Sequence, residues 1–136
     1  MTPFSLKIVT PDGLEYEGQV EELIVRTTSG DMGILAGHIN CVAPLGMGQA
    51  VIVANGKRRT AACIGGMLSV VGGAVTLVPT TFEWAEDIDV DRVLTSEKRA
   101  QTVLSNKSST DTDIRMAEAR LKRALIRKNV ASHKPM

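Results

Sequence analysis

The chain has 136 residues, of which 43% are hydrophobic and 23% charged, as in a soluble globular protein long enough to bury its own core. Only 3% are aromatic, which predicts an aliphatic core and leaves few stacking surfaces for single-stranded nucleic acid. No apolar run approaches the roughly 20 residues of a membrane-spanning helix and no signal-peptide pattern is present, so we expect a cytosolic or peripheral protein.

Charge is distributed unevenly along the chain. Residues 1–87 carry nine acidic and five basic side chains, whereas residues 88–136 carry six acidic and eleven basic ones. The division predicts two parts with different partners, the second attracted to an acidic surface. Cys41 and Cys63 form no Cys-x-x-Cys pair, so we expect no metal or redox site and interpret both as small buried hydrophobic residues.

The first part of the chain alternates polar and apolar residues in the manner of β-strands. Strands are predicted at residues 4–9, 14–18 and 22–28. A turn is predicted at Pro11-Asp12-Gly13, between the first two strands.

The run Gly30–His38 contains three glycines and is predicted to be a loop between strands, because glycine tolerates backbone conformations that other residues avoid. Asp31 and His38 are expected to be exposed near its two ends. Ile34 and Leu35 are expected to anchor it in the core.

Turn signals divide the rest of the first part into short strands. Pro44 predicts an edge position for the strand at residues 41–45. Asn55-Gly56 and Gly72-Gly73 are each flanked by apolar strands and predict two hairpins. Strands this short and this closely spaced indicate an antiparallel sandwich or barrel that ends near Trp84.

Beyond the sandwich the apolar spacing becomes helical. Asp87 or Asp89 is a suitable N-cap for a helix whose apolar stripe is Val90, Val93, Leu94, Ala100, Val103 and Leu104. A polar break follows, in which Thr110 and Asp113 resemble a capping box. The second helix carries its apolar stripe at Ile114, Ala117, Leu121, Ala124 and Leu125. Two helices joined by a short polar turn predict a helical hairpin.

The order of these features resembles the epsilon-subunit family of bacterial F-type ATP synthases over essentially the whole chain. The residues that carry the resemblance are Thr27-Thr28-Ser29-Gly30-Asp31-Met32-Gly33-Ile34-Leu35-Ala36-Gly37-His38, then Gly65-Gly66, then Ile88-Asp89 at the start of an alanine- and arginine-rich hairpin. Ala36 departs from the family, which usually has proline at that position.

The resemblance implies an antiparallel β-sandwich of about ten strands in residues 1–85, followed by an antiparallel two-helix hairpin in residues 86–136. It also implies a non-catalytic rotor subunit that links the gamma subunit to the c-ring and whose helices inhibit ATP hydrolysis. Such a subunit requires no cofactor, contacts the membrane only through its complex, and lies on the cytoplasmic face of the bacterial cell membrane. A plastid subunit on the stromal side of the thylakoid is the alternative.

The family places the loop corresponding to Gly30–His38 against the c-ring, which makes Asp31 and His38 the predicted c-ring contacts. Charged and polar side chains at such a rim fix register and orientation more than affinity. The alternative interpretation is a surface acid and a loop histidine bonded to backbone.

The basic face of the second helix is the next candidate. The resemblance implies that the hairpin, when it extends along gamma, meets the catalytic beta subunits and also the alpha subunits. The residues expected to contact an acidic segment of the beta subunits are Arg115, Lys122, Arg123 and Arg127. A hairpin folded against the sandwich would be the permissive form. An ordinary solvated helix face is the alternative.

Some bacterial members of the family bind regulatory ATP through an Ile/Leu-Asp-x-x-Arg-Ala motif and arginines of both helices. Ile88, Asp89 and Arg92 match that motif, while Val93 stands in place of alanine. The added bulk of Val93 puts the fit of an adenine or ribose in question.

Spacing groups the remaining arginines. Arg99 lies seven residues after Arg92, so both project within about 20° of each other on the first helix. Arg123 and Arg127, four residues apart, share a face of the second. Guanidinium groups from two helices could hold a polyphosphate, whereas the alternative is a set of ordinary helix ion pairs.

Two other classes of function fit the sequence less well. An enzyme would need a nucleophile elbow, a phosphate-binding glycine loop with its lysine, or a metal-ligand cluster, and the sequence contains none of these. A sandwich module whose basic hairpin binds nucleic acid would need interleaved aromatics. We therefore expect an acidic protein partner and no nucleic acid.

Overall fold

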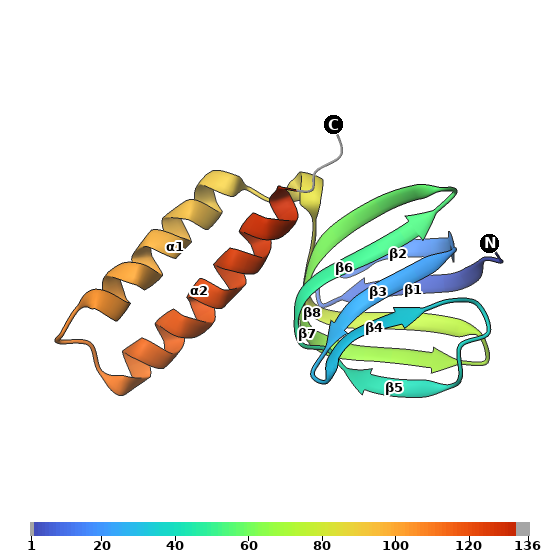
Figure 1. The fold of residues 1–136 in the computed structure, drawn as a ribbon, viewed down its shortest axis with the longest axis horizontal. Coiled ribbons are helices and arrows are strands. Elements are labelled where there is room, and N and C mark those ends of the chain that lie inside the picture. The colour runs from blue at the N-terminus through green and yellow to red at the C-terminus, as the bar shows by residue number, and fades with distance from the viewer. Residues whose placement is uncertain (1, 133–136) are drawn as a thin grey trace.

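The computed structural model describes residues 2–132, which form a β-sandwich followed by two helices (Figure 1). The strands are β1 (Phe4–Thr10), β2 (Gly13–Val20), β3 (Glu22–Thr27), β4 (Gly30–Ile34), β5 (Cys41–Pro44), β6 (Met47–Ala54), β7 (Lys57–Val71) and β8 (Ala74–Trp84). A short 3₁₀ helix, η1 (Ala85–Asp87), leads into α1 (Val90–Ser105) and α2 (Asp111–Ala131). The predicted sandwich followed by a helical hairpin is confirmed.

The long strands β7 and β8 build both layers of the sandwich. Residues 57–64 of β7 pair with β6, whereas residues 67–70 pair with β5. The bend between these halves lies at Gly65 and Gly66, whose φ angles of +68° and +104° favour glycine. The first half of β8 pairs with β1 on one side and with residues 66–71 of β7 on the other, whereas its second half pairs with residues 61–64 of β7. One layer is therefore β2-β1-β8-β7-β5 and the other is β4-β3-β6-β7-β8.

The strand count differs from the expected number of about ten. Eight strands are present in the described residues, because β7 and β8 run without a break through both layers and each contributes to two sheets. The pairing of β1 with β8 is parallel, although all the other strand pairings are antiparallel.

The glycine-rich run was predicted to be a loop, but its first part, Gly30–Ile34, is β4 and pairs with β3. Its side chains therefore alternate between the two faces of the sheet. Ile34 is fully buried, as expected, whereas Leu35 is 48% exposed. The prediction that Leu35 anchors the run in the core is therefore wrong.

The predicted hairpin turns are confirmed. Asn55 and Gly56 have φ angles of +54° and +72°, and Gly72 and Gly73 have φ angles of +57° and +83°. These positive values are what two-residue hairpin loops require. Pro44 ends β5, which within residues 2–132 pairs only with β7 and lies at a sheet edge as predicted.

Two hydrophobic clusters stabilise the fold. The larger lies between the sandwich layers and consists of aliphatic residues such as Leu6, Ile8, Leu23 and Leu77, with Phe82 and Trp84 at one end. All of its members come from residues 4–84, so the sandwich has a core independent of the helices. Cys63 belongs to this core, whereas Cys41 is half-buried.

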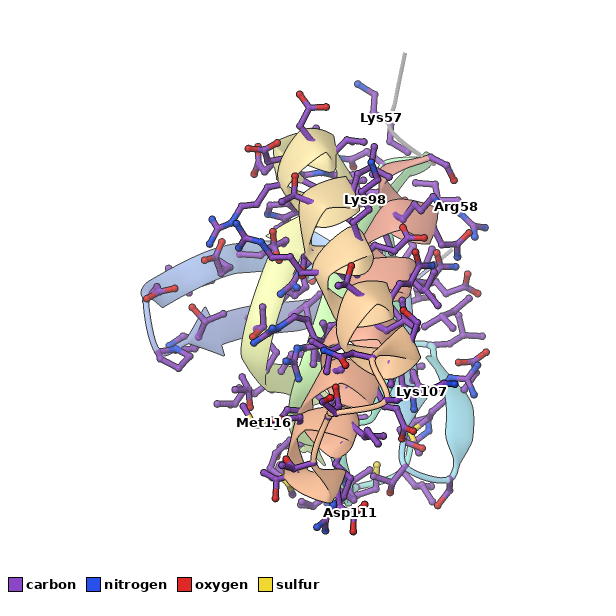
Figure 2. The ribbon with its side chains drawn as sticks, turned by 90° about the vertical axis from the view of Figure 1, so that its left-hand side faces the viewer. Lys57, Arg58, Lys98, Lys107, Asp111 and Met116 are labelled. Carbon is purple, nitrogen blue, oxygen red and sulfur yellow. The ribbon has the colours of Figure 1, made fainter. Side chains whose placement is uncertain are left out.

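Both helices begin with the predicted caps. The side chain of Asp89 accepts a hydrogen bond from the backbone N–H of Arg92, and Thr110 and Asp113 form a full capping box. Such caps satisfy backbone donors that a helix start leaves unpaired. Figure 2 shows the two helices in front of the sandwich, with Lys107 and Asp111 at one end and Lys57 and Arg58 at the start of β7 near the other.

The hairpin is attached to the sandwich mainly through α2. The smaller cluster joins Ala124, Val130 and Ala131 of α2 to Ala62 of β7, and also includes Ala85, Ile88 and Val93. Figure 1 shows the C-terminal end of α2 next to η1 and the loop between the helices far from the sandwich. Several residues of the predicted stripes are consequently exposed, namely Val90, Leu94 and Leu125.

The predicted second domain extends to residue 136, but residues 133–136 lie outside the described residues. Neither described helix is long and apolar enough to cross a membrane.

Candidate functional site

A cleft of about 580 Å³ lies where the sandwich meets the hairpin. The sandwich lines it with the β1–β2 turn and the second half of β8, through Thr10, Asp12, Thr80, Thr81, Phe82 and Glu83. The hairpin lines it through Asp87, Asp89, Arg92, Val93, Ser96, Ala124 and Arg127. Its volume is in the range of small-molecule sites.

An ion pair crosses the cleft from α2 to β8. The Nε of Arg127 lies 2.5 Å from Oε1 of Glu83, and the two side chains are 25% and 33% exposed. Glu83 points away from the sandwich core because its neighbours Phe82 and Trp84 alternate into that core. Among the described residues, this is the ion pair that joins α2 to the sandwich.

The start of α1 forms another wall of the cleft. Asp89 is the N-cap and its Oδ1 accepts from the backbone N–H of Arg92 at 3.1 Å, which places Arg92 in the first helical turn. Two guanidinium groups from two helices therefore border one cleft. Guanidinium groups bind phosphate oxygens through charge-assisted hydrogen bonds, whereas carboxylates accept from amino or hydroxyl groups.

The structure brings together only part of the predicted ATP-binding set. Asp89, Arg92 and Arg127 line the cleft, whereas Ile88 is buried in the smaller hydrophobic cluster. Arg99 and Arg123 are not among the lining residues. Arg99 shares the angular position of Arg92, but seven residues of helix rise place it about 10 Å farther along the axis.

Val93 stands where the motif has alanine. It lines the cleft and is 6% exposed, so the added bulk of valine lies at the cleft wall.

Sequence reasoning missed Asp12, Thr81 and Glu83, which the sandwich contributes to the cleft. The alternation of β8 predicts that Glu83 points outward, but not that α2 covers it. The turn at Asp12 is evident from sequence, yet its position beside the hairpin depends on how the layers are assembled.

The predicted c-ring contacts lie at opposite ends of β4. Asp31 is the second residue of that strand, and its Oδ1 lies 2.9 Å from Nε of Arg26, the residue paired with it on β3. His38 follows the other end of β4, and its Nδ1 lies 2.8 Å from the carbonyl oxygen of Ile39. Figure 1 shows the β3–β4 turn on the side of the helices and the segment between β4 and β5 on the far side.

The basic residues of α2 have different surroundings. Arg115 and Lys122 are exposed, Arg123 is half-buried and Arg127 is paired with Glu83. Lys122 lines a second, more open cleft of about 690 Å³ beside Arg26, Met47 and Leu125. Lys128 Nζ lies 3.4 Å from Oε2 of Glu97, a pair that links α2 to α1.

Arg59 connects the end of the sandwich to η1. Its guanidinium carbon lies 3.6 Å from the centre of the Trp84 ring, and its Nη2 lies 2.6 Å from Oε1 of Glu86. Partial burial acts to raise the pKa of Glu86, but the Arg59 hydrogen bond, a backbone hydrogen bond and the charge of Arg59 outweigh it. The net pKa of Glu86 is below its ordinary value.

An apolar patch covers the outer face of the layer that contains β5. Pro44, Met67 and Val78 are neighbours across three paired strands, and all three are exposed. Val42 and Val71 are 65% and 60% exposed beside them. Exposed apolar residues that form a continuous patch mark interaction surfaces, whereas scattered ones do not.

No group of three or more His, Cys, Asp or Glu side chains in residues 2–132 is placed to hold a metal ion. Burial raises the pKa of the Cys63 thiol to about 12, so this cysteine is protonated and unreactive in the folded protein.

Two family models together match residues 3–132. Residues 3–85 match "ATP synthase, Delta/Epsilon chain, beta-sandwich domain", and residues 86–132 match "ATP synthase, Delta/Epsilon chain, long alpha-helix domain".

Curated relatives are similar over nearly their full length. The ATP synthase epsilon chain of Bacillus velezensis is 46% identical over 133 residues, covering 98% of this chain and 100% of the relative. That of Caldanaerobacter subterraneus is 41% identical, covering 95% of this chain and 94% of the relative.

A solved structure has the same fold. A chain of the Euglena gracilis mitochondrial ATP synthase, from a structure of its OSCP/F1/c-ring part, superimposes with a TM-score of 0.83 at 23% identity, covering 98% of this chain and 83% of that one. The family matches and the curated relatives together settle the relationship: the chain belongs to the ATP synthase epsilon-chain family.

Proposed function

We propose that the chain is a non-catalytic rotor subunit of a proton-translocating F-type ATP synthase, which links the gamma subunit to the c-ring. The names of its relatives support this role, as does its fold, which it shares with a chain of an F1/c-ring assembly. We place it at the cytoplasmic face of a bacterial cell membrane, attached through the complex. Its similarity to Bacillus proteins favours this location over a plastid.

The apolar patch at Val42, Pro44, Met67, Val71 and Val78 is the proposed gamma-binding surface. A permanent partner there would remove from water an apolar face that β5, β7 and β8 present together. Asp31 and His38 remain the proposed c-ring contacts. Because they lie at opposite ends of β4, they would contact the c-ring at separate points.

The hairpin is the proposed inhibitory element. In the docked form Arg127 is paired with Glu83, which removes one positive charge from the basic face of α2. Undocking would free that charge, so that Arg115, Lys122, Arg123 and Arg127 could meet an acidic segment of the catalytic subunits. The contacts that must break are mostly alanine side chains, which contribute little apolar area.

ATP is the proposed ligand of the cleft at Arg92 and Arg127, and it is regulatory rather than required. The sandwich and the hairpin both line this cleft, so a ligand that contacts both walls stabilises the docked form by mass action. The ligand would thereby oppose inhibition. This cleft, shared by two parts of the chain, is the observation that carries the proposed regulation.

The test is reconstitution of the catalytic head with full-length chain and with a chain that lacks residues 88–136. The truncated chain keeps the whole sandwich core and should bind gamma normally while ATPase activity rises. Equal activity with the two chains would refute inhibition by the hairpin.

A chain carrying Val42→Asp and Met67→Asp should lose binding to gamma, and retention of binding would refute the proposed patch.

A further inference from the structure

Two buried side-chain oxygen atoms on β6 and β7 have no hydrogen-bond partner among the described residues. They are Oε1 of Gln49 on β6, a residue that is half-buried as a whole, and Oγ1 of Thr60 on β7. Thr60 is 6% exposed as a whole residue.

Both side chains are on the face of the sheet that α2 covers. Ala50 and Ala61, which follow them in sequence, belong to the sandwich core, so Gln49 and Thr60 point the other way. Gln49 is paired in register with Ala62, and Ala62 packs against Ala124 and Val130 of α2 in the smaller cluster. Since this face is turned away from the sandwich core, the hairpin provides the cover that buries these atoms.

Burial of an unpaired hydroxyl or amide oxygen is unfavourable, because the group gives up its hydrogen bonds to water and gains none in return. When the hairpin leaves, both oxygens return to water. The unfavourable contribution therefore exists only in the docked form, where it opposes the alanine contacts and the Arg127–Glu83 pair.

We propose that Gln49 and Thr60 lower the stability of the docked hairpin and thereby set the fraction of molecules in which it is undocked. This inference rests on the proposed switch and adds the residues that determine its balance. Small apolar contacts and one ion pair hold the hairpin, and two unpaired polar groups offset part of that attraction. The balance leaves the docked form sensitive to a ligand in the cleft.

The experiment measures undocking through a thiol at the interface. Val130→Cys is introduced on α2 together with Cys41→Ser. Val130 is fully buried in the smaller cluster and does not line the cleft, so a thiol reagent reaches the new cysteine only when the hairpin leaves. Cys63, buried in the sandwich core, stays in the protein as the reference for unfolding of the sandwich.

Thr60→Val replaces the hydroxyl by a methyl group, and Gln49→Met removes the amide at similar length. Each should slow labelling of the interface thiol about tenfold. The reason is that one unpaired buried polar group shifts the equilibrium between docked and undocked hairpin by about that factor. Thr60→Ser keeps the hydroxyl and should not slow labelling. Cys63 should label no faster in any variant.

Unchanged or faster labelling in both Thr60→Val and Gln49→Met would overturn the proposal, as would equal slowing by Thr60→Ser. Addition of ATP to the parent protein separates this inference from the proposed regulation. If ATP leaves labelling unchanged while Thr60→Val slows it, the regulatory role of the cleft fails and the role of Gln49 and Thr60 stands.

Discussion

Arg127 of α2 and Glu83 of β8 join the two parts of the molecule through contact of Nε with Oε1 at 2.5 Å. The residues are separated by 44 positions in sequence. One belongs to the basic hairpin and the other to the acidic sandwich, so the uneven charge of the chain acts within the molecule as well as toward partners. The same guanidinium borders the cleft, where a phosphate group would compete with Glu83 for it.

Glu83→Gln should weaken docking of the hairpin by about 1 kcal/mol, which corresponds to about a fivefold increase in undocking. The effect is modest because both side chains keep part of their surface in water. Hydrogen exchange at α2 residues such as Ala124 would measure it. Lys128→Ala is the control, since Lys128 pairs with Glu97 inside the hairpin. Equal effects of the two changes would mean that the Arg127–Glu83 pair does not hold the hairpin.

Arg92→Ala should weaken ATP binding by about tenfold or more, because a charge-assisted hydrogen bond to phosphate contributes on the order of 2 kcal/mol. Arg99→Ala should leave affinity within about twofold, since Arg99 does not line the cleft. Titration monitored by amide shifts and by the fluorescence of Trp84 would compare them. Absence of any response at millimolar ATP in the unmodified protein would eliminate nucleotide binding altogether.

Glu86 should make stability depend on pH in the acid range. Its pKa is lowered on folding, so the contribution of its carboxylate is complete above the ordinary value near 4.5 and is lost as pH falls through the lower folded value. Glu86→Gln should remove that part of the acid-induced loss. Thermal unfolding of both proteins between neutral pH and pH 3 would show it, and identical pH profiles would exclude Glu86 as a source.

Gly66→Ala should destabilise the sandwich by about 3 kcal/mol or more. A Cβ at this position, where φ is +104°, would lie 2.0 Å from the carbonyl oxygen of Val78 and 2.6 Å from the Cα of Pro79. Gly73→Ala is the matched control, because its φ is +83° but no atom lies within 4 Å of the added Cβ. Its expected loss is about 1 kcal/mol. Denaturant unfolding would decide, and similar losses would argue against a steric limit at the β7 bend.

Local patterns in the sequence predicted most elements of the fold. Asn55-Gly56 and Gly72-Gly73 specify hairpins through backbone conformation alone, and Asp89 and Thr110 specify helix starts through their side chains. Each of these signals depends on residues only a few positions apart. The glycine-rich run was misinterpreted because its pairing with β3 outweighs the weak strand preference of glycine.

The candidate site was only partly predictable. The motif at Ile88, Asp89 and Arg92 indicated one wall, and helix periodicity could not show that Arg99 lies too far along α1 to reach the cleft. Glu83 and Asp12 join the site only because α2 and the start of α1 lie against the sandwich.

The sequence by itself determined the two-part organisation, the hairpin turns, the helix caps and the family, because each depends on local spacing or on motifs in order along the chain. Only the tertiary structure decided that Arg127 meets Glu83, that Asp31 and His38 lie at opposite ends of β4, and that Oε1 of Gln49 and Oγ1 of Thr60 are buried without a partner among the described residues. These relationships depend on how the helices dock onto one face of the sheet. That geometry results from packing between residues far apart in the chain, which local patterns do not encode.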